Sequence, residues 1–201
     1  MIPTMEEARA ILEPYHQRLR EAVEGGWAEW KLLQSCRSEH GLAPVLYGRT
    51  ICNVVFDAIA RIAIFSFATD PKVHVEIEPQ TFKLHFPNLC VRIKKGDDDH
   101  LGRNVPTQAV LAFVEADGLL PGMPPETGKV EVVWLPNEIW TDVDRILVVA
   151  RDGDQLIWEY EIDRSKPSAE VVPFPTPTEP DPGDSPLVRP RTSAKLDTKQ
   201  Q

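Results

Sequence analysis

The sequence predicts an α+β protein in which N-terminal helices, one of them long and buried, pack on an antiparallel sheet of about six strands with one short intervening helix. Two observations lead to this class. The spacing of apolar residues changes from helical to alternating after Asp70-Pro71, and the pair Asp152-Gly153 joins two alternating segments as in a hairpin. Proline then becomes frequent after residue 163. We therefore expect one domain over 1–163 and a disordered, proline-rich tail over 164–201.

The first helix is predicted from a capping box. Thr4 is followed three residues later by Glu7, so each side chain can bond the backbone N–H of the other residue. Apolar residues then repeat at helical spacing as far as Gly25-Gly26, where we expect this helix to end. Pro14 interrupts the pattern and lacks a backbone donor, which predicts a kink or two short helices. A separate short helix is expected to carry Trp27, Trp30, Leu33 and Cys36.

A long apolar segment over 44–68 predicts the central, mostly buried helix. The segment is too long for one strand, and apolar residues occupy most of its circumference. Pro44 suits a first helical turn. The many β-branched residues lower the intrinsic helix preference, so this helix should depend on tertiary packing.

Alternating segments predict two antiparallel meanders. Strands are expected around Val73–Ile77, Phe82–Phe86 and Leu89–Ile93, joined by short turns, each with one face on the core and one face in water. A short amphipathic helix should follow, running from Pro106-Thr107 to Gly118. Three further strands are then expected at Val130–Leu135, Arg145–Ala150 and Leu156–Ile162.

The charge of the chain is unevenly distributed. The net charge is −9, and residues 164–201 hold six Lys/Arg and five Asp/Glu, so segment 1–163 carries −10. An acidic body repels phosphate backbones at long range, which makes nucleic acid an improbable partner of the body and favours a protein partner. With 42% hydrophobic residues the domain should fold without a cofactor.

Cysteine usage and the N-terminus bear on location. Cys36, Cys52 and Cys90 are odd in number and widely spaced, which favours free thiols in a reducing compartment, and we expect the cytoplasm. The N-terminus has neither a basic region nor an apolar stretch of the kind that directs secretion, and we expect no membrane segment.

One loop gathers potential metal ligands. Asp97, Asp98, Asp99 and His100 are of types that bind a hard divalent cation. However, the spacing does not match a calcium loop, and adjacent residues of an extended segment point to opposite sides. A solvated loop is the simpler interpretation, and a metal or catalytic role is the alternative.

A second candidate site lies on the third predicted strand. Arg92, Lys94 and Lys95 could act as point charges for a phosphate or nucleotide, with Arg103 and Asn104 donating from the next loop. The simpler interpretation is a solvated face whose cations pair across strands with neighbouring Glu and His residues. A nuclease of the carboxylate-plus-lysine type would need an acid in this strand, and residues 91–95 have none.

A polar stripe runs along the long predicted helix. Arg49, Asn53, Asp57 and Arg61 recur every four residues, so they share one narrow face. They form either a solvent-facing edge with an Asp57–Arg61 pair or, if the helix is covered on all sides, a buried polar stripe that requires partners.

The remaining motifs do not specify a reaction. The sequence contains no glycine-rich phosphate loop, no Gly-x-Ser-x-Gly, no His-Glu-x-x-His and no Cys-x-x-Cys. Trp140 lies in a loop and is the tryptophan that we expect to contact a partner.

These observations favour a small cytoplasmic bacterial accessory protein that acts by binding another protein and is not an enzyme. It would be of antitoxin or regulator type, and one form of this hypothesis places it on a mobile element. The alternative hypothesis is an enzyme or toxin that acts on a nucleotide or nucleic acid. One form of this hypothesis makes the activity metal-dependent. It would use Asp97–His100 together with the strand of Arg92, Lys94 and Lys95.

Overall fold

The computed structural model describes residues 2–102, 108–115, 118, 122, 124 and 127–163. The predicted tail, 164–201, lies outside the described residues. The described residues belong to one unit, Met1–Ser165. In chain order the elements are α1 (Met5–Leu12), the 3₁₀ turn η1 (Glu13–Tyr15), α2 (His16–Glu39), α3 (Gly48–Phe67), β1 (His74–Glu78), β2 (Thr81–Phe86), β3 (Leu89–Lys95), α4 (Gln108–Val114), β4 (Gly128–Pro136), β5 (Val143–Asp152) and β6 (Gln155–Glu161).

The six strands form one sheet in sequence order, β1 to β6. Both predicted meanders are present, because β1–β2–β3 and β4–β5–β6 pair antiparallel throughout. The meanders are joined by β3 and β4, which run parallel. This pair departs from the antiparallel prediction because the chain leaves β3, passes through α4 and returns to begin β4 in the same direction.

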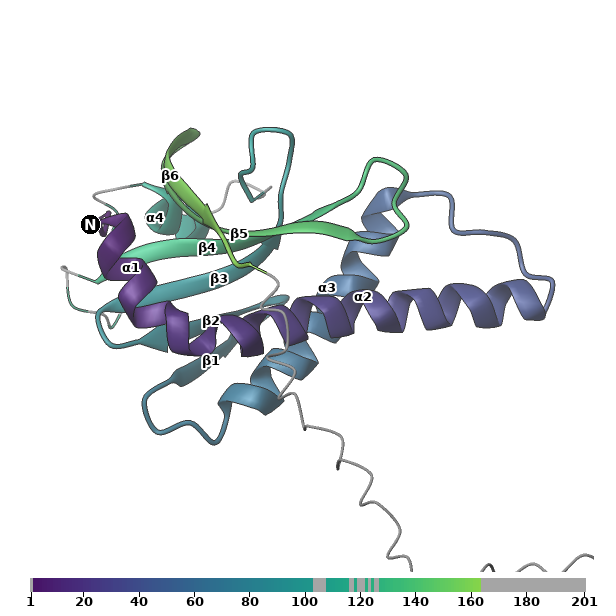
Figure 1. Ribbon diagram of the computed structural model, residues 1–201, viewed down its shortest axis with the longest axis horizontal. Helices are drawn as coiled ribbons and strands as arrows, with labels where there is room; N and C mark the ends of the chain where they lie inside the picture. The colour runs from purple at the N-terminus through teal and green to yellow at the C-terminus, as the bar shows by residue number, and fades with distance from the viewer. Residues whose placement is uncertain are drawn as a thin grey trace, which may run out of the picture. The chain divides into compact units, whose positions relative to one another are not determined.

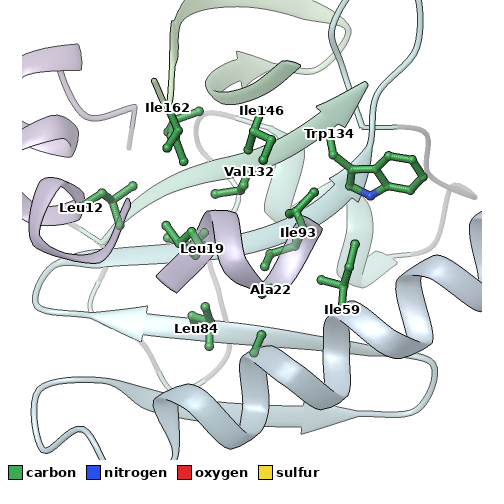
Figure 2. Close-up of a cluster of buried hydrophobic side chains, with 14 of the residues drawn as sticks. Leu12, Leu19, Ala22, Ile59, Leu84, Ile93, Val132, Trp134, Ile146 and Ile162 are labelled. Carbon is green, nitrogen blue, oxygen red and sulfur yellow. The ribbon is translucent and has the colours of Figure 1, made fainter. Parts of the chain in front are cut away.

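The main core lies between the sheet and the helices α1, α2 and α3. Figure 1 shows α1 and α2 crossing one face of the sheet while α4 lies behind it. Side chains from all three N-terminal helices meet those of the central strands in one apolar cluster. Figure 2 shows Leu19 of α2 and Ile59 of α3 in this cluster, together with Ile93 of β3 and Val132 of β4. The alternation of the strands therefore predicted the face that carries the core.

The opposite face of the sheet is partly covered by α4. Phe113 and Val114 pack on Cys90 of β3. The buried Lys129 of β4 donates through Nζ to the carbonyls of Ala112 (3.0 Å), Glu115 and Gly118 (2.8 Å), at the C-terminal end of α4. A cation at this end of a helix satisfies carbonyls that lack an intrahelical partner. The predicted water-facing side of the central strands is therefore partly buried.

The N-terminal helices confirm two predictions and contradict a third. Thr4 and Glu7 form the capping box. Pro14 lies in η1, which separates α1 from α2. The expected helix end at Gly25-Gly26 is wrong, because α2 continues to Glu39. These glycines instead allow α2 and α3 to approach, since a Cβ on Gly26 would lie 2.5 Å from Ile59 Cγ1 and 2.9 Å from a backbone carbonyl of α3.

The apolar helix predicted over 44–68 is α3, which begins later, at Gly48, and is less buried than expected. Its inner face contributes Val55, Ile59, Ala63 and Phe67 to the core, whereas Phe65 is 86% exposed. Within the described ranges, α3 is the one helix whose length and composition would allow it to cross a membrane. A core helix can meet the same criterion, and the inner face of α3 belongs to the core shared with the sheet.

Candidate functional site

A groove of about 970 Å³ lies where the first half of α3 faces the ends of β2 and β3. Its walls come from α3, the β1–β2 turn, β2, β3, α4, β4 and the loop between β4 and β5. The lining residues are Gly48, Arg49, Cys52, Asn53, Phe56, Glu78, Pro79, Gln80, Thr81, Lys83, Arg92, Lys94, Lys95, Val110, Trp134 and Trp140.

The groove forms where β2 and β3 diverge. Their register joins Leu84–Phe86 to Leu89–Val91, close to the turn that connects the two strands. Farther from this turn, Thr81 and Lys83 of β2 and the residues 92–95 of β3 line the groove instead. The end of β3 keeps its pairing with β4 as far as Lys95. An opening within the sheet therefore lets side chains of both sheet faces reach one site.

Cationic side chains dominate the ionisable lining of the groove. Lys83 is neutralised, because its Nζ lies 2.6 Å from Glu78 and 3.3 Å from Glu76. Arg92, Lys94 and Lys95 differ from it. In the described part of the chain, no carboxylate lies within ion-pair distance, 4.0 Å, of these three cations. Glu131, opposite Arg92 on β4, and Glu78 attract Arg92 and Lys94 from farther away, so the three cations are only partly compensated in an otherwise acidic body.

Each of these three cations contacts an aromatic ring. The guanidinium of Arg92 lies 4.9 Å from the Phe113 ring centroid. Lys94 Nζ lies 5.7 Å from the centroid of Phe56, and Lys95 Nζ lies 5.5 Å from that of Trp140. Such contacts stabilise a cation without neutralising it. The positive charge therefore remains available to an anion.

Burial affects the pKa values of two of these groups. Burial and, to a lesser extent, the neighbouring Arg92 lower the pKa of Lys94 to about 8. Burial also lowers the pKa of Arg92, whose side chain is only 4% exposed. Desolvation disfavours the charged form of both groups, and a bound anion would favour it again.

In the part of the chain that the structure describes, three buried polar atoms without a hydrogen-bond partner belong to residues that line the groove. They are Arg92 Nε, Thr81 Oγ1 and Trp134 Nε1. Buried polar groups are almost always bonded, and an unsatisfied donor costs about 1–3 kcal/mol. Trp134 is fully buried at the opposite end of the core from Leu12 (Figure 2). Donors concentrated beside one groove are typical of a binding site.

Trp140 is held at the groove in an unusual backbone conformation. Its φ angle is +56°, a region that large side chains rarely adopt. The turn is fixed by Asn137, whose backbone carbonyl accepts from Trp140 N and whose Oδ1 accepts from Thr141 N. A Cβ on Gly48, at the start of α3, would lie 3.8 Å from the Trp140 ring. Strain of this kind is concentrated at functional sites.

The structure brings together most residues of the candidate contact set. Arg92, Lys94, Lys95 and Trp140 all line the groove, although they come from different segments. Arg103 and Asn104 lie outside the described residues.

The solvated-face interpretation of the first meander is correct in part. Lys83 pairs with Glu76 and Glu78, and His85 Nε2 lies 2.8 Å from Glu76. However, Lys83, His85 and Arg92 are buried, so this part of the face is not solvated.

The prediction that the polar stripe on α3 is buried is wrong. Arg49, Asn53, Asp57 and Arg61 are all exposed, because this side of α3 faces away from the core. Arg61 pairs with Glu29 at 2.6 Å. Arg49 and Asn53 nevertheless line the groove, whereas the other half of the stripe lies farther along the helix.

Two polar side chains of the Asp97–His100 loop bond to other groups of the protein. Asp97 Oδ1 accepts from the backbone N–H groups of Asp99 and Leu101, and His100 Nδ1 lies 2.7 Å from Glu159. Among residues with a described position, no group of three or more Asp, Glu, His or Cys side chains could hold a metal ion. In the described residues, the loop therefore does not assemble the metal site that was the alternative to a solvated loop.

Sequence reasoning missed Phe56, Thr81 and Trp134 as groove residues. Each continues an apolar or alternating pattern that predicts core packing, and no signal in the sequence marks the divergence of β2 from β3. Comparisons of the chain with models of protein families, with curated proteins and with solved structures found no match. The site has to be interpreted from its own chemistry.

Proposed function

We propose that this chain is a binding protein for a small anionic molecule, which it holds in the groove between α3 and the diverging ends of β2 and β3. One observation carries the proposal: Arg92, Lys94 and Lys95 converge on the groove without a carboxylate at ion-pair distance in the described residues. The proposal keeps nucleotide or phosphate binding by Arg92, Lys94 and Lys95 from the alternative hypothesis of the sequence analysis. It does not include metal-dependent catalysis.

The energetics of burial support this proposal. An unpaired buried charge is costly, and protein folds normally neutralise it with a partner. Here Lys83 is paired with two glutamates, whereas the buried Arg92 and the partly buried Lys94 and Lys95 have no carboxylate at ion-pair distance among the described residues. An anionic ligand would offset this cost on binding, and it would accept hydrogen bonds that the buried Arg92 does not make within the protein.

The start of α3 adds a second favourable element. Gly48 lines the groove, and the N-cap residue Tyr47 makes no side-chain capping bond. The first turn of a helix presents the positive end of the helix dipole and N–H groups without an intrahelical partner, although in α3 the N–H of Thr50 donates to the Tyr47 carbonyl. An anion in the groove would gain from both.

Calorimetric titration of the full chain with inorganic pyrophosphate and with citrate tests the proposal. We expect at least one anion to bind, with an affinity that falls as salt is raised. The Lys94→Met variant should bind at least tenfold more weakly. Lys31→Met, which removes an exposed lysine of α2 far from the groove lining, should bind like the natural chain. Absence of binding for both anions, or equal losses in the two variants, would refute the proposal.

A second function, binding of a protein partner, is favoured by exposed apolar residues where α2 ends and α3 begins. Leu46 is 82% exposed, Leu32 70% and Tyr47 62%. Large apolar side chains exposed near one another in the chain can belong to an interaction surface. We propose this role for the cytoplasm, where Cys36, Cys52 and Cys90 would remain reduced; none of the three forms a disulfide in the structure.

Affinity capture with the natural chain and with a Leu32→Asp/Leu46→Asp variant tests this second function. The natural chain should recover one stoichiometric partner that the variant loses. If light scattering shows a monomer at every concentration and no partner is recovered, the partner hypothesis fails.

A further inference from the structure

The groove is larger than an inorganic anion requires. Its volume of about 970 Å³ is at the upper end of the range for sites that hold drug-sized ligands, about 300–1,000 Å³. The cations lie along one part of the wall, on β3. Phe56, Val110 and Trp140, which are partly exposed, contribute apolar surface to other parts. The ligand therefore needs an apolar, ring-sized portion as well as an anionic group.

Trp140 is the residue best placed to contact such a ring. Its indole is only partly buried, and the turn of Asn137 fixes its backbone. The ammonium group of Lys95 lies over the indole ring. Lys95 has a flexible four-carbon stem and no ion-pair partner among the described residues. Lys95 can therefore leave the indole face and turn its ammonium group toward a bound anion.

The unpartnered donors restrict the chemistry of the ligand further. Arg92 Nε can only donate, and Thr81 Oγ1 can donate or accept. A ligand with carbonyl oxygens or ring nitrogens would satisfy them, whereas a pure hydrocarbon would not. An aromatic heterocycle linked to a strongly anionic group combines all these requirements.

From these contacts we infer that the ligand is a free nucleotide, with its phosphates at Arg92, Lys94 and Lys95 and its base stacked on Trp140. This inference rests on the proposed function, because it assumes that the groove binds an anion. It adds the class of molecule and assigns the aromatic contact to one residue.

The charge of the body favours a free nucleotide over a polymer. Segment 1–163 carries −10, so a nucleic acid that extends beyond the groove meets an acidic surface and is repelled. A nucleoside diphosphate carries few charges, which the three cations on β3 would offset. The groove therefore attracts the short ligand without requiring the rest of the surface to bind it.

The test compares four nucleoside diphosphates (ADP, GDP, CDP and UDP) with inorganic pyrophosphate and with the corresponding nucleosides, by calorimetry on the full chain without divalent metal. At least one diphosphate should bind ten times more tightly than both pyrophosphate and its own nucleoside. Trp140→Asn removes the ring while retaining a residue that tolerates a positive φ angle, so folding should be preserved. This variant should lose about tenfold or more in nucleotide affinity, as expected for a stacked base, and bind pyrophosphate unchanged. Trp140→Phe should retain most of the nucleotide affinity.

The other outcomes distinguish the two proposals. If pyrophosphate binds as tightly as every diphosphate and Trp140→Asn changes neither affinity, the nucleotide inference is wrong while the anion site stands. If neither pyrophosphate nor any diphosphate binds, both proposals fail. A single-stranded oligonucleotide that binds more tightly than every diphosphate would overturn the assignment to a free nucleotide.

Discussion

Replacing Lys94 by Met should stabilise the protein near neutral pH. The lysine is partly buried, has no carboxylate at ion-pair distance among the described residues, and lies beside Arg92. Met has a similar length and no charge, so it removes the desolvation and repulsion while filling the same space against Phe56. A residue that lowers stability and lines a groove is typical of a binding site, where function rather than stability maintains it.

The magnitude follows from the pKa of Lys94. This pKa falls from an ordinary value of 10.5 to about 8, and each tenfold change in a protonation equilibrium corresponds to about 1.4 kcal/mol, which sets an upper bound of about 3.5 kcal/mol. Solvent screening of this partly exposed group reduces the figure to about 1–2 kcal/mol. Loss of the contact between the ammonium and the Phe56 ring costs about 0.5–1 kcal/mol. We expect a net gain of about 1 kcal/mol.

The sign of the pH dependence is opposite to that of a paired lysine. The destabilisation by Lys94 is fully present below pH 8, where the folded protein must hold the charge. It decreases between pH 8 and 10.5 and is absent above pH 10.5, where the amine is neutral in the folded and unfolded chain. The advantage of Lys94→Met should therefore be largest at pH 7 and smaller at pH 9.5.

Urea unfolding of the natural chain and of Lys94→Met at these two pH values measures this effect. Lys31→Met serves as the control and should change the free energy of unfolding by less than about 0.5 kcal/mol. If Lys94→Met is less stable than the natural chain at pH 7, or if its advantage grows at pH 9.5, the reasoning about an unneutralised charge is wrong.

Three further predictions concern packing and reactivity. Gly26→Ala should destabilise the protein by about 1–3 kcal/mol because a Cβ there meets α3 backbone, whereas Gly25→Ala meets one movable methyl group and should cost less; thermal unfolding compares them. Lys129→Met should release the last turn of α4 and increase amide exchange over 108–115, and unchanged exchange would contradict its role in holding that turn. At pH 8 the exposed Cys36 should react with a thiol reagent, while burial raises the pKa of Cys90 to about 12 and should protect it until the protein unfolds. Early modification of Cys90 by mass spectrometry would contradict this.

Much of the fold could be predicted from local patterns. Alternation located all six strands, and the capping box at Thr4 and the proline in η1 are where the sequence placed them. The parallel pairing of β3 with β4 could not be predicted in this way. Alternation indicates which face of a strand is buried and does not specify the neighbouring strand or its direction.

The glycine pair of α2 shows a second limit. Gly25-Gly26 resembles a helix end, because glycine weakens a helix and often follows its last residue. Contact with α3 stabilises the helix there, and the missing side chains are what allows this contact. Tertiary packing reverses the local preference.

The sequence by itself determined the α+β class, the positions of the strands and the candidate residues Arg92, Lys94, Lys95 and Trp140, because periodicity and charge are properties of neighbouring residues. Only the tertiary structure decided that these residues share one groove with Phe56 and Trp134, and that Asp97 bonds within its own loop while His100 bonds to Glu159 of β6. The groove depends on where β2 separates from β3 and on how closely α3 approaches them. Both are results of packing between segments far apart in the chain, which no local pattern encodes.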